Sequence, residues 1–256
     1  MPRLAPPDDP NMETHAIGGS TFHFSAAKIG NLGASEYTLA TIVVDGSGSV
    51  DPFFSDIRKV LKENVIACQG TPQRPNPRAD NLMLRVLIHD QHIIEVHGFK
   101  PVRDIDPNEY DNVQQPGGMT AMHDAVYNAV QATVQCAKDL AAKQYTSNGA
   151  IFVLTDGMDN YSKVSRKMVA AAMKDAKTSE TLESMMPVLI GVNTDATSGL
   201  NQYLEDFQKE AEFQQYVRLE DATKEKLMKL GGFISQSISS QSKSLGSGGA
   251  PKSLSF

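Results

Sequence analysis

The sequence has little cysteine, no long apolar run and no excess of basic residues, and each shortage excludes a class of protein. Cys68 and Cys136 are the only cysteines among 256 residues, and both fall in helix-like patterns, so we expect buried thiols rather than a disulfide. No segment approaches the roughly 18 consecutive apolar residues of a membrane-spanning helix, and the N-terminal residues lack the apolar core of a signal peptide. The net charge of −6 argues against nucleic-acid binding, which normally needs a basic face. We therefore expect a cytoplasmic protein with no nucleic-acid and no membrane partner.

The chain is long enough to form one domain with a full hydrophobic core. Its 40% hydrophobic and 21% charged residues are typical of a globular protein. We predict a disordered segment over residues 1–19, a single domain over residues 20–240, and a flexible Ser/Gly-rich tail over residues 241–256.

Within the domain, apolar strand patterns alternate with amphipathic helix patterns. Strands are expected at residues 21–25, 37–44, 82–88, 93–96, 150–155, 187–192 and 215–219. Helices are expected at residues 52–67, with Asp51 as N-cap, and at 120–143, 162–177, 200–212 and 223–240. This alternation predicts a doubly wound α/β fold: a mostly parallel central sheet with one antiparallel edge strand, at 93–96, and helices on both faces. The segment 21–25 has the alternation of a half-exposed edge strand.

A long loop is expected over residues 99–119, and it carries Asp104, Asp106, Glu109 and Asp111. Loops of this length without regular structure are uncommon and are often functional. A solvated polar connection explains the composition equally well, so both interpretations stay open.

Two predicted strands end in an aspartate, and both should open at the same edge of the sheet. Asp45 follows the first central strand and is spaced by glycines from Ser47 and Ser49, while Asp156 follows the strand at 150–155. Alternation along an extended chain turns Asp45 and the two serines the same way. Thr120 follows two glycines at the start of a helix. Since ligands of open α/β sheets bind beyond the carboxyl ends of the strands, we predict that these five residues form one site.

The side chains of this site offer only oxygen ligands, three hydroxyls and two carboxylates. Hard oxygen ligands suit Mg²⁺, with Mn²⁺ or Ca²⁺ as alternatives, and disfavour Zn²⁺ and copper. If the neutral hydroxyls make most of the direct contacts, the cation keeps much of its positive charge. An open coordination position would then attract an Asp or Glu from a partner protein.

These residues resemble the metal-ion-dependent adhesion site of the von Willebrand factor type A (VWA) domain, which reads Asp-x-Ser-x-Ser, then Thr, then Asp. The resemblance extends over residues 37–240, and all five site positions match: Asp45, Ser47, Ser49, Thr120 and Asp156. It implies that the serines and the threonine ligate the metal, that the aspartates act directly or through water, and that a partner's acidic side chain completes the shell. Within the family, the chain is similar to bacterial or phage intracellular single-domain members, including those of tellurite-resistance operons.

Other polar residues near these motifs are assigned structural roles. Asp124 is expected to be an exposed first-turn residue favoured by the helix dipole, and Asp159 and Asn160 to shape the loop after Asp156. Four histidines have no Cys or His partners at metal-ligand spacing: His89, His92, His97 and His123.

Two other functions are alternatives to the adhesion site. A Mg²⁺-dependent phosphohydrolase of haloacid-dehalogenase type is the first alternative. Such enzymes carry an Asp-x-Asp motif after the first strand, and its second aspartate is the general acid. Here that position is Ser47, which cannot serve in this role. The chain also lacks a phosphate-binding Gly-Lys-Ser/Thr loop and a Gly-x-Ser-x-Gly nucleophile elbow. A scaffold whose metal is only structural is the second alternative. We predict a non-catalytic, metal-dependent protein-interaction module with no catalytic residues.

Overall fold

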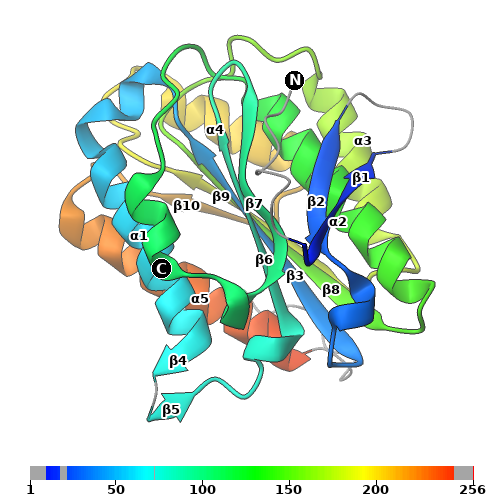
Figure 1. The fold of residues 1–256 in the computed structure, drawn as a ribbon. Helices are drawn as coiled ribbons and strands as arrows, with labels where there is room; N and C mark the ends of the chain where they lie inside the picture. The colour runs from blue at the N-terminus through cyan, green and yellow to red at the C-terminus, as the bar shows by residue number, and fades with distance from the viewer. Residues whose placement is uncertain (1–9, 18–21, 72, 245–255) are drawn as a thin grey trace.

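The computed structural model describes residues 10–17, 22–71, 73–244 and 256. Within these residues, an eight-stranded sheet has the order β1-β2-β7-β6-β3-β8-β9-β10, and helices cover both faces (Figure 1). The strands are β1 (Met12–Ala16), β2 (His23–Ala27), β3 (Glu36–Asp45), β6 (Leu82–His89), β7 (Ile93–Pro101), β8 (Thr146–Thr155), β9 (Met185–Gly191) and β10 (Gln215–Arg218). A small hairpin pairs β4 (Gly70–Thr71) with β5 (Arg74–Pro75). The α-helices are α1 (Phe54–Gln69), α2 (Met122–Ala141), α3 (Arg166–Lys177), α4 (Leu200–Glu210) and α5 (Lys224–Ser244).

The strand directions confirm the predicted fold class. Strands β6, β3, β8, β9 and β10 run parallel to one another. Strand β7, predicted at 93–96, returns antiparallel to β6 as expected, but it is not an edge strand, because β2 lies on its other side. The sheet then continues through β2, which is parallel to β7, and β1, which is antiparallel to β2. The predicted edge strand at 21–25 is therefore β2, at His23–Ala27, and it is mostly buried because β1 lies outside it.

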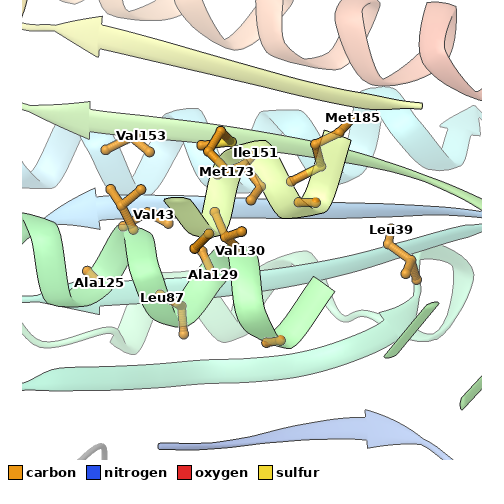
Figure 2. Packing of buried hydrophobic residues seen from close by; sticks show 14 of the residues in the cluster. Leu39, Val43, Leu87, Ala125, Ala129, Val130, Ile151, Val153, Met173 and Met185 are labelled. Atoms are coloured by element: carbon orange, nitrogen blue, oxygen red, sulfur yellow. The ribbon is translucent and has the colours of Figure 1, made fainter. Parts of the chain in front are cut away.

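Strands β3 and β8 lie at the centre because their mostly apolar carboxyl-terminal halves can face a hydrophobic layer on both sides. On one face, Val43 and Val153 pack with α2, α3 and α4 (Figure 2). On the other face, Val44 and Phe152 pack with α1 and α5. The small side chains of α2, such as the fully buried Ala129, bring this helix close to the sheet. The two cysteines are free and buried, as expected, and burial raises the pKa of the Cys68 thiol to about 12.

Strand β2 reaches β7 only because Gly98 has no side chain. A Cβ atom at this position would lie 2.0 Å from the carbonyl oxygen of Ser25. Beside this contact, the Glu95 carboxylate accepts hydrogen bonds from the Ser25 backbone N–H (3.1 Å) and hydroxyl (2.7 Å). The carboxylate also forms a buried ion pair with Arg85, whose Nε lies 2.6 Å from Glu95 Oε1. Arg85 Nη2 donates to Asn128 on α2 at 2.9 Å, so the pair links three strands and a helix.

Part of the predicted N-terminal disorder is wrong. Met12–Ala16 forms β1, and the ring of His15 stacks on Phe24 with 4.9 Å between centroids. The strand is polar because most of its side chains face solvent, and its stability comes from backbone pairing with β2, which composition does not reveal. Residues 1–9 and 18–19 lie outside the described residues.

The start of α1 also differs from the prediction. Gly48–Phe53 forms a 3₁₀ helix, and α1 begins at Phe54 with Phe53 in the N-cap position, so Asp51 is not the cap. At the other end of the chain, α5 continues to Ser244, beyond the predicted end of the domain. It does so because Gln241 is buried and donates a hydrogen bond to Ser184 at 2.8 Å. Residues 245–255 lie outside the described residues.

The predicted loop at 99–119 is more ordered than its composition indicates. Strand β7 extends to Pro101, and 3₁₀ helices follow at Val102–Asp104 and Pro107–Asn112. Tyr110 is fully buried, and its hydroxyl lies 2.6 Å from Nε2 of His97. Burial lowers the pKa of His97 to about 4. No helix within the described residues combines the length and apolar character needed to cross a membrane.

Candidate metal site

The two strand ends that carry the predicted aspartates are neighbours. Strands β3 and β8 are parallel, with Val44 aligned to Leu154. Asp45 is the last residue of β3, and Asp156 follows Thr155, the last residue of β8. Both carboxylates therefore emerge at the same edge of the sheet, as the sequence predicts.

The loop after β3 brings its serines to the second aspartate. The Ser47 N–H donates to Asp45 Oδ1 at 2.9 Å. The hydroxyls of Ser47 and Ser49 lie 3.2 Å apart, and Ser49 Oγ donates to Asp156 Oδ1 at 2.7 Å. Gly46 permits this path, because a Cβ there would lie 2.6 Å from a methyl group of Ile88 and 2.7 Å from the Pro116 ring.

Thr120 completes the cluster from the start of α2. A Cβ atom added to Gly157 would lie 3.3 Å from Thr120 Oγ1 and 3.8 Å from Asp45 Oδ2. The loop before Thr120 is tied to the serine loop, since the Gly117 N–H donates to the Gly46 carbonyl at 2.9 Å. Gly117 and Gly118 have φ of 73° and 95°, in the left-handed region that glycine adopts readily. The structure thus gathers all five predicted residues.

Thr155 also belongs to the site, and the sequence analysis missed it. Its hydroxyl donates to Asp45 Oδ2 at 2.6 Å and accepts the Gly157 N–H at 3.2 Å. Both oxygens of Asp45 are therefore engaged, one by Thr155 and one by the Ser47 N–H. The available signal was alternation, because a threonine at the end of β8 faces the same side of the sheet as Asp45 at the end of β3.

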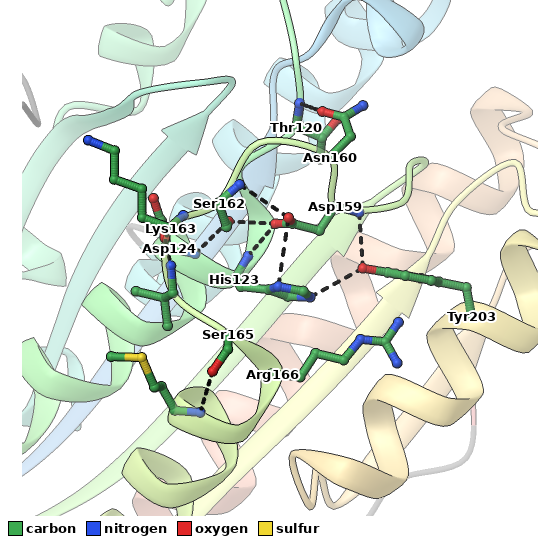
Figure 3. Close-up of polar contacts among 12 residues, drawn as sticks. Thr120, His123, Asp124, Asp159, Asn160, Ser162, Lys163, Ser165, Arg166 and Tyr203 are labelled. Atoms are coloured by element: carbon green, nitrogen blue, oxygen red, sulfur yellow. Dashed lines mark hydrogen bonds and ion pairs between the residues drawn. The ribbon is translucent and has the colours of Figure 1, made fainter.

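Asn160 holds the backbone of Thr120 from both sides (Figure 3). Its side-chain Oδ1 accepts the Thr120 N–H at 2.9 Å. The N–H groups of Asn160 and Tyr161 donate to the Thr120 carbonyl at 3.0 and 3.2 Å. The loop after Asp156 therefore sets the position of the threonine, in agreement with the structural role expected for Asn160.

Asp159 joins the same loop to α2 and α4 (Figure 3). It accepts hydrogen bonds from the Ser162 hydroxyl at 2.5 Å and from the His123 backbone N–H at 2.9 Å. The Asp159 N–H donates to the Tyr203 hydroxyl, which lies 3.2 Å from His123 Nε2. Burial is the main cause that lowers the pKa of His123, which favours the neutral imidazole.

Asp124 is more than the exposed first-turn residue that the sequence predicts. The side chain is only partly exposed, and its Oδ1 accepts the N–H groups of Lys163 and Val164 at 3.0 and 2.8 Å. Asp124 therefore holds the C-terminal end of the loop that follows Asp156, at Lys163 and Val164. The prediction failed because these donors are some 40 residues away in sequence.

The two site carboxylates are buried without a cationic partner. The exposed fractions of Asp45 and Asp156 are 1% and 5%, and among the described residues no Lys, Arg or His forms an ion pair with either. The pKa of Asp156 is raised to about 6, mainly by burial and in smaller part by the charge of Asp45, while the hydrogen bond from Ser49 acts in the opposite direction. Two buried carboxylates without a counter-charge are costly, so the site fits a divalent cation.

Hydroxyl groups are needed to complete a metal shell here. No group of three His, Cys, Asp or Glu side chains in the described part of the chain has metal-binding geometry. Ser47 and Thr120 are buried beside the carboxylates, and Ser49 is exposed at the mouth of the site. Such an all-oxygen set suits a hard cation and leaves one side open to solvent.

The comparisons with known proteins show the fold. No protein-family model matches the chain, and no curated protein is significantly similar to it. Among solved structures, a D319A mutant of the PilB minor pilin of Streptococcus sanguinis aligns over 86% of this chain, with a TM-score of 0.55 and 14% identity. The pilus adhesin SpaC of Lactobacillus rhamnosus GG aligns over 85%, with a TM-score of 0.56 and 11% identity. Proximal thread matrix protein 1 (PTMP1) of the mussel byssus aligns over 79%, with a TM-score of 0.52 and 20% identity.

The chain spans 65% of the PilB structure, 32% of SpaC and 46% of PTMP1. Another PTMP1 structure, with a TM-score of 0.50 and 18% identity, has a metal-ion-dependent adhesion site (MIDAS) motif that is occupied by zinc. Sequence identities this low show similarity of fold alone. The fold is VWA-like, with a mostly parallel sheet, an antiparallel pair and helices on both faces.

Proposed function

We propose that this chain is a VWA-type module that binds a partner protein through a divalent cation at the strand ends. The observation that carries the proposal is the pair of buried carboxylates, Asp45 and Asp156, which lie among hydroxyl groups and have no cationic partner in the described residues. The residues that would hold the cation are Asp45, Ser47, Ser49, Thr120 and Asp156. Mg²⁺ is the proposed ion, since oxygen ligands alone favour hard cations.

The role of the cation is to present positive charge to an acidic side chain of the partner. Ser49 and the glycines around the loops leave the mouth of the site accessible, while Thr155 and the Ser47 N–H hold the Asp45 carboxylate in one orientation. A site prepared in this way loses little conformational entropy when the partner binds. We extend the proposal to a bacterial or phage protein of the cytoplasm, in the manner of the tellurite-resistance members.

Binding is favoured over catalysis because of the chemistry at the site. A phosphohydrolase of haloacid-dehalogenase type would need a general acid where Ser47 lies, and a serine hydroxyl cannot supply one near neutral pH. A purely structural metal is the remaining alternative, and the open side of the site argues against it.

Metal titration tests the first half of the proposal. Calorimetry with Mg²⁺, Mn²⁺ and Ca²⁺ should show one site, and Mg²⁺ at a hundredfold excess over its dissociation constant should raise the unfolding free energy by about 2.7 kcal/mol. Asp45→Ala and Asp156→Ala should abolish both effects, because each removes a buried carboxylate that no other group replaces. Asp175→Ala, which removes an exposed carboxylate of α3, is the control and should bind metal normally.

Partner binding tests the second half. A pull-down in Mg²⁺ against chelator, read by mass spectrometry, should recover a protein that the Asp45→Ala and Asp156→Ala variants do not retain. If these variants, in chelator, retained the same partner as well as the unaltered chain does in Mg²⁺, the adhesion role would be wrong. Mg²⁺-dependent release of phosphate from a generic phosphate ester, lost in Asp45→Asn, would favour the enzyme instead.

A further inference from the structure

Two exposed apolar side chains flank the threonine of the metal site. Met119 immediately precedes Thr120 and is 45% exposed, and Tyr161, at 47%, donates its backbone N–H to the Thr120 carbonyl at 3.2 Å. Single exposed apolar residues are common on protein surfaces and need no explanation. These two lie on backbone segments that are hydrogen-bonded to each other at Thr120, a residue of the candidate site.

Core packing does not account for these side chains. Met119 and Tyr161 are exposed and are not among the buried and partly buried side chains of the two hydrophobic clusters, whereas Met158 in the same loop packs against one of them. The backbone that carries them is nevertheless well anchored, because Asn160 accepts the Thr120 N–H and donates to its carbonyl. Apolar groups on an anchored backbone can be buried by a partner at small entropic cost.

We infer that Met119 and Tyr161 form an apolar contact surface beside the cation, and that the partner segment carries an apolar side chain next to its Asp or Glu. This inference rests on the proposed function. A carboxylate alone gives little specificity, since any acidic peptide or solute offers one. Methionine and tyrosine are enriched at protein interfaces: methionine adapts to irregular partners, and tyrosine adds a large rigid face with a polar end.

The partner that fits this surface is a protein segment rather than a small acid. The cation would select the carboxylate by charge. Met119 is adjacent to Thr120 in sequence and Tyr161 is bonded to the Thr120 carbonyl, so one segment can make both contacts from neighbouring positions. A small dicarboxylate would leave Met119 and Tyr161 exposed and gain nothing from them.

The experiment selects a phage-displayed library of random heptapeptides on the full chain in Mg²⁺, with selection in chelator as background. The expected result is enrichment of Asp or Glu with an apolar residue directly beside it. The enriched peptide should bind the Met119→Ser/Tyr161→Ser variant at least about tenfold more weakly, as truncation of interface contacts generally does. Calorimetric Mg²⁺ affinity should be unchanged, because the bond from residue 161 to Thr120 is made by the backbone.

Met228→Ser is the matched control, since Met228 is 37% exposed on α5, a helix that carries none of the five site residues; it should bind the peptide as the unaltered chain does. Acidic peptides without an apolar neighbour, or equal affinity for the double variant, would overturn the inference and leave the metal-dependent function standing. Absence of any Mg²⁺-dependent enrichment of acidic peptides would overturn both. Circular dichroism of the variants verifies that they are folded.

Discussion

Two parts of the sheet bury carboxylates, and they treat the negative charge in opposite ways. In the interior, between β6 and β7, Glu95 pairs with Arg85 at 2.6 Å. At the edge, Asp45 and Asp156 accept hydrogen bonds from neutral hydroxyl and backbone donors, and no cationic side chain among the described residues reaches them. The negative charge of Glu95 is balanced by Arg85, whereas the described residues provide no counter-charge for Asp45 and Asp156.

The difference indicates which buried charges serve structure and which serve binding. Removing a carboxylate from water is costly in both places, and a paired cation repays the cost. Where the chain supplies that cation itself, the group can be closed into the core, as Arg85 and Glu95 are by Phe24 and Phe99. Where the chain supplies only hydroxyls, the proposed cation from solution would complete the balance, so the missing counter-charge supports the proposed binding site more specifically than burial does.

The largest effect is expected when the interior pair is broken. Glu95→Gln should lower the unfolding free energy by about 3–5 kcal/mol, because it leaves the Arg85 charge buried without its partner. Urea unfolding followed by circular dichroism measures this loss, which should be the same in Mg²⁺ and in chelator.

Lys62→Ala is the control for this prediction. It removes a partly exposed ion pair with Asp111, at 2.6 Å, and should cost less than about 1 kcal/mol. A comparably small loss for Glu95→Gln would mean that the interior pair does not need its negative charge.

A substitution at the edge should have the opposite sign. In chelator, Asp156→Asn should raise the unfolding free energy by about 1–2 kcal/mol, because it removes the repulsion between two buried carboxylates. The same variant should gain no stability from Mg²⁺. The unaltered chain should therefore become the more stable of the two as the Mg²⁺ concentration rises. Thermal unfolding with and without chelator measures both effects.

Asp175→Asn is the matched control for the edge, and its stability should be unchanged in either solution. If Asp156→Asn proved as destabilising in chelator as Glu95→Gln, the two regions would not differ in the way proposed.

The smallest effect is expected at the loop that positions Thr120. Asn160→Ala should cost about 1 kcal/mol of stability, since it leaves the Thr120 N–H without its acceptor, and should weaken Mg²⁺ binding about tenfold, as loss of an orienting contact does. Calorimetry measures the affinity. Asn201→Ala, which removes a bond to Glu205 on α4, should have a similar stability cost and normal metal affinity; equal affinity in both variants would remove Asn160 from the positioning of the site.

Much of the edge region could be predicted from the sequence, because its parts follow from strand geometry. Apolar strands ending in Asp45 and Asp156 open at one edge of a parallel sheet, and glycines mark the loops that bring in the hydroxyls. Thr155 escaped prediction because its role depends on which strand lies beside β8, a fact that the sequence near it does not contain.

The interior region could not be predicted. Arg85 and Glu95 meet across an antiparallel pair whose register shifts on both sides of Val86, so their pairing does not follow from alternation. Strand β1 was missed because its exposed polar residues resemble those of a disordered segment. The order of the segment at 99–119 depends on buried Tyr110 and its contact with His97, and this contact joins residues that only the fold brings together.

The hydrogen bond between Ser49 and Asp156 spans 107 residues, and a cation at the same point would also join the chain at Thr120. Such an ion would act as a noncovalent cross-link between three loops: the one after Asp45, the one before Thr120 and the one after Asp156. A link between segments so far apart in sequence restricts the opening motions of the chain. Local opening and closing of the three loops would then become one cooperative event rather than three. Amide hydrogen exchange in these loops would slow together on addition of metal, so occupancy of the site would be recorded in the backbone before any partner arrives.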